Sequence, residues 1–114
     1  MNKLISFVQI NMNRSGLAAV ELNERLKKVK DHYVCLVTEP FRYRGKIASA
    51  PAKACIVPGN IADPRATILS SIELTEITAL CTRDSAVALL KSKELSILIA
   101  VSYTHLTLPT IYSV

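Results

Sequence analysis

The chain has 114 residues, with 14 Lys and Arg against 9 Asp and Glu, so its net charge at pH 7 is +5. Half of the residues are apolar and only three are Gly, which excludes disordered and collagen-like chains, and no apolar run reaches the roughly 18 residues that a membrane span needs. Three widely spaced Cys without a C-x-x-C motif argue against a disulfide framework or a zinc site, and the positive excess favours an anionic partner.

The first elements in the chain are a strand and a helix. Residues 3–12 are rich in Ile, Val and Phe and predict a buried strand whose polar end begins at Asn11. Ser15 follows as a helix cap, because its hydroxyl can accept a hydrogen bond from an unpaired first-turn amide. Apolar residues then recur every three or four positions with charged residues between them, which predicts an amphipathic helix. These apolar positions are Ala18, Leu22, Leu26 and Val29.

A second buried strand is predicted over residues 33–38, and Glu39-Pro40 ends it because proline cannot continue a central ladder. Strand, helix and strand together span about 36 residues, which is the size of a crossover unit with two adjacent parallel strands. Residues 41–53 form a basic loop in this prediction.

The rest of the chain predicts short strands separated by turn signals. Residues 86–90 could instead be helical, and Ser92-Lys93-Glu94 predicts a hairpin turn. The predicted strands are residues 54–57, 66–70, 77–81, 86–90 and 95–100.

The C-terminal residues differ from those before them, because every charged residue lies between Lys3 and Glu94. Residues 101–110 read Val-Ser-Tyr-Thr-His-Leu-Thr-Leu-Pro-Thr, which one interpretation makes a Thr- and Tyr-rich edge strand that ends at Pro109. We favour another, because this string resembles the translation of a common transposase-type sequencing adapter. We therefore expect native sequence over 1–100 and a non-native tail over 101–114, in which His105 is no catalytic base.

Polar side chains end both strands of the predicted parallel pair. Asn11 and Glu39 would emerge at the same carboxyl edge of the sheet, where ligands bind in open α/β folds. A carboxylate and an amide can hold Mg²⁺, which prefers oxygen ligands and keeps several waters. The alternative is that Glu39 is a solvated acid at a strand end and Asn11 a turn former.

Two segments carry a resemblance to a known family. Residues 7–15 (F-V-Q-I-N-M-N-R-S) and 34–41 (V-C-L-V-T-E-P-F) together resemble the start of the endonuclease/exonuclease/phosphatase superfamily. They are most similar to the apurinic-like endonuclease domain of insect non-LTR retrotransposons. Segments 63–69 and 82–84 are also similar, so the resemblance covers about residues 5–100.

The resemblance implies an α/β fold, the N-terminal portion of a DNase I-like two-sheet sandwich. It implies a metal-dependent phosphodiesterase that nicks DNA for target-primed reverse transcription, with a reverse transcriptase domain downstream. By position, Asn11 and Glu39 match residues that act in catalysis and at a Mg²⁺ or Mn²⁺ site, while Asn13 and Arg14 match the retrotransposon motif. We expect Asn13, Arg14, Arg42 and Arg44 to contact DNA. We expect the protein to lie inside the cell, in the nucleus or the cytoplasm.

Part of the family's catalytic set has no counterpart here. No G-D-F-N-like or S-D-H-like segment is present, and His32 precedes a strand at the end away from the predicted site. We therefore expect this chain to be inactive as an enzyme. The alternatives are a non-catalytic basic α/β module that binds nucleic acid and a phosphatase acting on a lipid or sugar phosphate.

Three smaller expectations complete the prediction. Arg42 and Arg44 could be residues of a solvated loop, and Arg83-Asp84 could be a local ion pair or a structural signature of the family that the chain resembles. A partial domain should also leave apolar surface and strand edges exposed over residues 4–10, 34–37 and 95–100, which predicts poor solubility.

Overall fold

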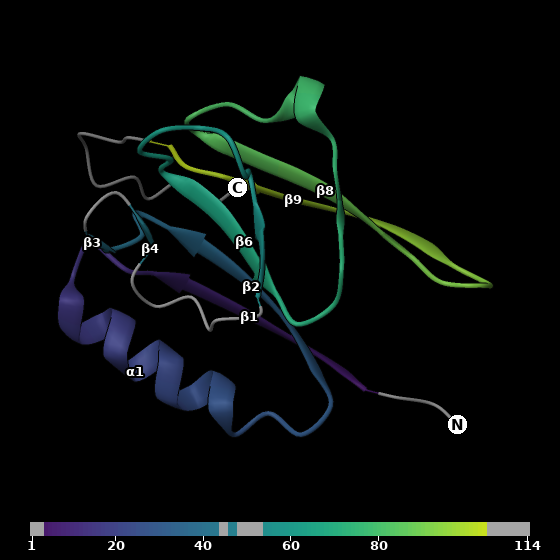
Figure 1. The fold of residues 1–114 in the computed structure, drawn as a ribbon, viewed down its shortest axis with the longest axis horizontal. Helices are drawn as coiled ribbons and strands as arrows, with labels where there is room; N and C mark the ends of the chain where they lie inside the picture. Colours follow the sequence, from purple (N-terminus) through teal and green to yellow (C-terminus); the bar gives the residue numbers. More distant parts are fainter. Residues whose placement is uncertain (1–3, 44–45, 48–53, 105–114) are drawn as a thin grey trace, which may run out of the picture.

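The computed structural model describes residues 4–43, 46–47 and 54–104. A four-stranded and a three-stranded sheet pack face to face, and one helix covers the outer side of the larger sheet (Figure 1). The architecture is therefore a partial two-sheet α/β sandwich, as the family resemblance implied. Within the described residues, no helix is long and apolar enough to cross a membrane.

The predicted crossover unit is confirmed. β1 (Ile5–Asn11) and β2 (His32–Thr38) are parallel, and α1 (Gly16–Lys27) connects them. The Ser15 hydroxyl accepts a 3.2 Å hydrogen bond from the Ala18 amide, so this residue is the helix cap. The helix ends at Lys27, two residues before Val29, which packs against the core from beyond the last turn.

The larger sheet is completed by two strands that run antiparallel to their neighbours. β5 (Cys55–Val57) pairs with β6 (Ala66–Ser70), and β6 pairs with β2, which gives the order β1-β2-β6-β5. All five residues of β6 are buried, because the helix side and the smaller sheet cover its two faces. This central strand links the two cores.

The smaller sheet has the order β7-β8-β9 and is built from β7 (Thr75–Glu76), β8 (Ser85–Lys91) and β9 (Ser96–Ser102). Residues 86–90 are a strand and not a helix, since alternate residues of β8 face the core. The predicted hairpin turn is also confirmed, because the Ser92 amide donates to the Leu95 carbonyl at 2.8 Å.

Two predictions for the loops are wrong. The strand predicted at 77–81 is a short 3₁₀ helix, η1 (Thr78–Leu80), because local bonds such as that from the Leu80 amide to the Ile77 carbonyl replace sheet pairing. The predicted basic loop contains a small antiparallel pair, β3 (Arg42–Tyr43) and β4 (Lys46–Ile47).

Two apolar cores hold the layers together. One lies between the sheets around Ile68, and the other lies between α1 and the larger sheet around Leu22. The expected apolar exposure is found at four side chains outside these cores. It is absent over residues 34–37, where Val34 is fully buried between the two sheets and Val37 is fully buried beneath α1. The exposed side chains are Leu4, Phe7, Leu95 and Leu98.

The three cysteines are free thiols, and Cys35 is fully buried in the core beneath α1. Burial raises the pKa of the Cys35 thiol to about 12, which removes the reactive thiolate at ordinary pH. We expect Cys35 to resist iodoacetamide at pH 8 in the folded protein and to react once urea unfolds it. Peptide mass spectrometry would measure this, and rapid native labelling of Cys35 would contradict the packing of α1.

Candidate functional site

The carboxyl edge of the parallel pair brings Asn11 and Glu39 to one place. Asn11 lies opposite Thr38 in the register, so Glu39 is the next residue beyond its partner. The Met12 amide donates to the Thr38 carbonyl at 2.9 Å and prolongs the pairing past the end of β1. The two residues are therefore neighbours in the backbone register, at the edge of the sheet where the sequence predicted them.

Backbone hydrogen bonds fix the loops around Glu39. Its carbonyl accepts from the Arg14 amide at 2.8 Å, and its own amide donates to the Arg65 carbonyl at 2.9 Å. The Asn11 side-chain oxygen accepts from the Asn13 amide at 3.1 Å. Glu39 thus ties the loop after β1 to the loop before β6.

Strained backbone gathers at this edge. Among the described residues, the non-glycine residues with left-handed φ values are Asn13, Arg14, Glu39 and Asp63. Asn and Asp tolerate this conformation, but at Arg14 and at Glu39 it costs about 1 kcal/mol or more of conformational free energy. Strain of this kind is retained where the surrounding structure enforces it and often marks a functional site.

Glu39 lies at the end of a chain of polar contacts. The Tyr103 hydroxyl donates to Glu39 Oε1 at 2.7 Å, and the Arg65 guanidinium lies over the Tyr103 ring, 5.3 Å from its centre. Arg65 in turn makes bonds of 2.6 and 3.0 Å to the two carboxylate oxygens of Asp84. The hydrogen bond to Glu39 raises the pKa of Tyr103, so the phenol stays protonated.

A second cluster lies beside the first, where three arginines meet at the Asp63 carboxylate. Nitrogen atoms of Arg42, Arg83 and Arg14 lie 2.6, 3.0 and 3.5 Å from its oxygens. Arg83 also donates to the Asp63 carbonyl at 3.2 Å. The hydrogen bond from Arg42 is the main cause that lowers the pKa of Asp63, and the bond from Arg83 and the charge of Arg14 act in the same direction. We name this group the arginine cluster.

The predicted DNA contacts fall into two groups. Arg14 and Arg42 both lie in the arginine cluster, and Asn13 lies in the loop beside Asn11. Arg44 lies outside the described residues, as does His105. Of the two alternatives for Arg83-Asp84, the local ion pair is not what the structure has, because these neighbours bind different partners, Asp63 and Arg65.

Sequence reasoning did not select five residues of this edge as site residues. The sequence contained only partial signals for them. Asp63-Pro64 was a turn signal, and segments 63–69 and 82–84 carried the family resemblance. Nothing in the sequence indicated that these segments meet. The residues are Asp63, Arg65, Arg83, Asp84 and Tyr103.

The oxygen donors at this edge are one carboxylate, from Glu39, and one side-chain amide, from Asn11. No group of three or more His, Cys, Asp or Glu is arranged to hold a metal within the described residues. Glu39 Oε1 accepts the Tyr103 hydroxyl, and the Asn11 side-chain oxygen, on the adjacent strand, accepts from the Asn13 amide. One carboxylate and one amide are compatible with Mg²⁺, which retains most of its water.

No histidine among the described residues lies at this edge. His32 is the first residue of β2, at the opposite end from Glu39, and its Nδ1 lies 3.5 Å from the Ser71 hydroxyl. Its prediction as a residue away from the site is confirmed.

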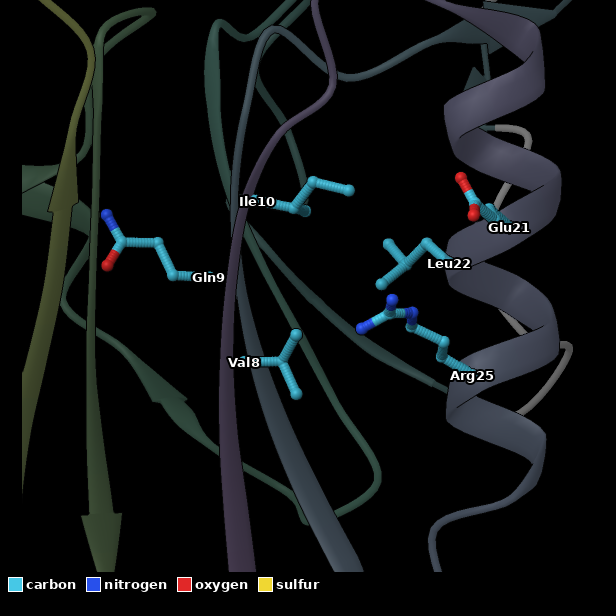
Figure 2. A pocket seen from close by; sticks show the side chains of 6 residues that line it. All are labelled: Val8, Gln9, Ile10, Glu21, Leu22 and Arg25. Carbon is cyan, nitrogen blue, oxygen red and sulfur yellow. The ribbon is translucent and has the colours of Figure 1, made fainter.

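A cavity of about 240 Å³ lies elsewhere, between β1 and α1. Figure 2 shows Val8 and Ile10 pointing toward the helix and Gln9 pointing to the other face of the strand. Glu21 and Arg25 line the helix side of the cavity. Because it lies on the helix side of the sheet, it is separate from the carboxyl edge.

The fold and the carboxyl edge together define the structural class of the chain. The chain is the partial form of a DNase I-like α/β sandwich, with polar side chains at the carboxyl edge of its parallel pair. Among solved structures, it is similar to the endonuclease domain of TRAS1, a telomere-specific non-LTR retrotransposon, with a TM-score of 0.68 and 19% sequence identity. The match covers 87% of this chain and 44% of that one, so this chain spans less than half of its length. No family model and no curated protein matches the chain.

Proposed function

We propose that the chain is part of a metal-dependent phosphodiesterase that nicks DNA during retrotransposon insertion. The observation that carries the proposal is the meeting of Asn11, Glu39 and the arginine cluster at one edge of a DNase I-like fold. The sequence resemblance to the apurinic-like endonuclease domain of insect elements supports the same assignment. A downstream reverse transcriptase domain and an intracellular location, nuclear or cytoplasmic, belong to this proposal.

The side chains have different proposed roles, which follow from their chemistry. Glu39 and Asn11 would hold Mg²⁺ or Mn²⁺, which stabilises negative charge on a phosphate and its leaving oxygen. Tyr103 orients the Glu39 carboxylate through its 2.7 Å hydrogen bond. Asn13, Arg14, Arg42 and Arg44 would contact DNA phosphates, which gives affinity that falls as salt rises.

The chain by itself should not cleave DNA. Water must be deprotonated for attack, and no histidine of the described residues lies near Glu39. The family's water-activating segments have no counterpart in the sequence. We therefore propose that this chain binds the metal and DNA without nicking.

Mn²⁺ titration tests the metal site separately from activity. Paramagnetic Mn²⁺ should broaden the NMR signals of the Asn11 and Asn13 amides first, and Glu39→Gln should abolish this broadening, because the substitution replaces the charged carboxylate ligand with a neutral amide. Glu24→Gln is the matched control, since Glu24 is an exposed acid on α1 that pairs with Lys27. Equal broadening in both variants would remove Glu39 from the metal site.

Supercoiled plasmid with Mg²⁺ tests the activity. We expect no nicking above the level of the Glu39→Gln variant. Nicking that disappears in Glu39→Gln would contradict the proposed inactivity and support the catalytic role of Glu39. Nicking that persists in this variant would indicate a contaminating nuclease.

The alternative is a non-catalytic module that binds nucleic acid. The arginine cluster favours it, because electrostatic binding needs no metal. Salt-dependent DNA binding that neither Mg²⁺ nor Glu39→Gln changes would select this alternative.

A further inference from the structure

Arg83 has no role in the site that the sequence predicted, yet its side chain reaches the same carboxylate as Arg14 and Arg42. These arginines come from three separate segments: the loop after β1, β3, and the loop before β8. One carboxylate faces three guanidinium groups, so these four side chains carry a net charge of +2, with Glu39 as the next carboxylate along the edge. Such convergence is unfavourable by charge repulsion unless an anion offsets it.

The guanidinium groups remain accessible and retain donors. Arg14 and Arg83 have about half of their side-chain surface exposed, 49% and 50%, and Arg42 has 25%. Each guanidinium has five N–H donors, and its contacts with Asp63 use one or two of them. Planar arginine donors match phosphate oxygens in pairs, which a lysine cannot do.

The cluster lies beside the candidate metal site. The Arg14 amide donates to the Glu39 carbonyl, and Asp63 is two residues before Arg65, whose carbonyl accepts from the Glu39 amide. Arg14 and Asp63 both have left-handed φ values in this arrangement. An anion held by the cluster would therefore lie close to Glu39.

We propose that Arg14, Arg42 and Arg83 bind one phosphate of a nucleic-acid backbone and that Asp63 is the positioning residue that holds their guanidinium groups together. This inference rests on the proposed function and adds Arg83 and Asp63 to it. Asp63 offsets the repulsion among the arginines and leaves their outward donors for the phosphate.

Binding of a fluorescent DNA duplex in EDTA, followed by anisotropy over a range of salt, tests Arg83 without any metal. Arg83→Gln should weaken binding about tenfold at low salt and reduce the salt slope by about 0.9, the loss of one phosphate contact. The matched control is Lys93→Gln, which removes the same charge from the exposed turn between β8 and β9. Equal effects of the two variants would overturn the proposal.

Asp63→Asn tests the positioning role by the sign of its effect. If Asp63 only screens the arginines, removal of its charge raises affinity for DNA; if it positions them, affinity falls. We expect a fall of several-fold, while Glu24→Gln, which removes a distant negative charge, leaves affinity unchanged or slightly raises it. Circular dichroism melts would verify that each variant folds, and a rise for Asp63→Asn would refute the positioning role.

The two proposals can fail separately. If wild-type protein does not bind the duplex, both the cluster and the proposed function fail. If it binds and Arg83→Gln equals Lys93→Gln, the cluster alone is refuted. Loss of Mn²⁺ binding leaves this assay unaffected, because EDTA removes the metal from it.

Discussion

Replacing Ile68 with alanine is expected to lower the free energy of unfolding by about 2–5 kcal/mol. Ile68 is fully buried at the middle of β6, and it lies opposite Leu36 of β2 and Val57 of β5 in the register. Its side chain belongs to the core between the two sheets. The substitution removes buried apolar surface and leaves a cavity in a strand that both layers hold in place.

Urea unfolding followed by circular dichroism would measure the effect. In a domain of this size, 1 kcal/mol corresponds to about 4–8 °C in melting temperature, so the loss should also be visible in a thermal melt. Leu98→Ala is the control, because 63% of the Leu98 surface is exposed on β9. We expect a change below about 0.5 kcal/mol for it. Similar losses in the two variants would contradict the sandwich.

The first part of the fold could be predicted from local signals. The apolar run over residues 3–12, the Ser15 cap and the helical spacing after it each depend on residues close in sequence, and together they determine β1, α1 and β2. The parallel pairing followed, because a crossover of this length joins adjacent strands. Asn11 and Glu39 could be placed together for the same reason.

The arginine cluster could not be predicted, because it depends on strand order. β6 runs antiparallel to β2, so Ala66 pairs with Thr38 and brings residues 63–65 to the edge that holds Glu39. Arg83 reaches the same edge through the other sheet, where the Arg65 amide donates to its carbonyl at 2.6 Å. No periodicity in the sequence indicates either crossing. The short 3₁₀ helix at 78–80 was missed because apolar residues there suggested a strand.

The end of β9 shows how the tail and the fold are related. The sequence predicts non-native residues from Val101 onward. β9 nevertheless continues through Ser102, and Val101 is buried with Ile97 and Ile99 on the inward face. A residue added to a strand takes its face from the alternation alone, so a tail of foreign origin can extend the ladder if its residues suit the positions.

Replacing Val101 with aspartate should therefore be severe, although this residue begins the predicted tail. Val101 is 7% exposed and pairs with Ala86 across the smaller sheet. A carboxylate at this position would be buried without a partner, and we expect a loss of about 3 kcal/mol or more in the free energy of unfolding. At low pH the aspartate is neutral, so part of the loss should be recovered as pH falls below its raised pKa.

Ser102→Asp is the matched control, because Ser102 is the next residue on the same strand and its side chain is exposed on the opposite face. We expect a change within about 0.5 kcal/mol for it. Urea unfolding of the two variants at neutral and acidic pH compares the effect of an added carboxylate on the inward face of β9 with its effect on the outward face. If both variants unfold like the wild type, residues 101–102 contribute nothing to the core, and the strand effectively ends at Ala100. If Val101→Asp alone is destabilised, the tail completes the sheet that supports Tyr103 at Glu39, whatever its origin.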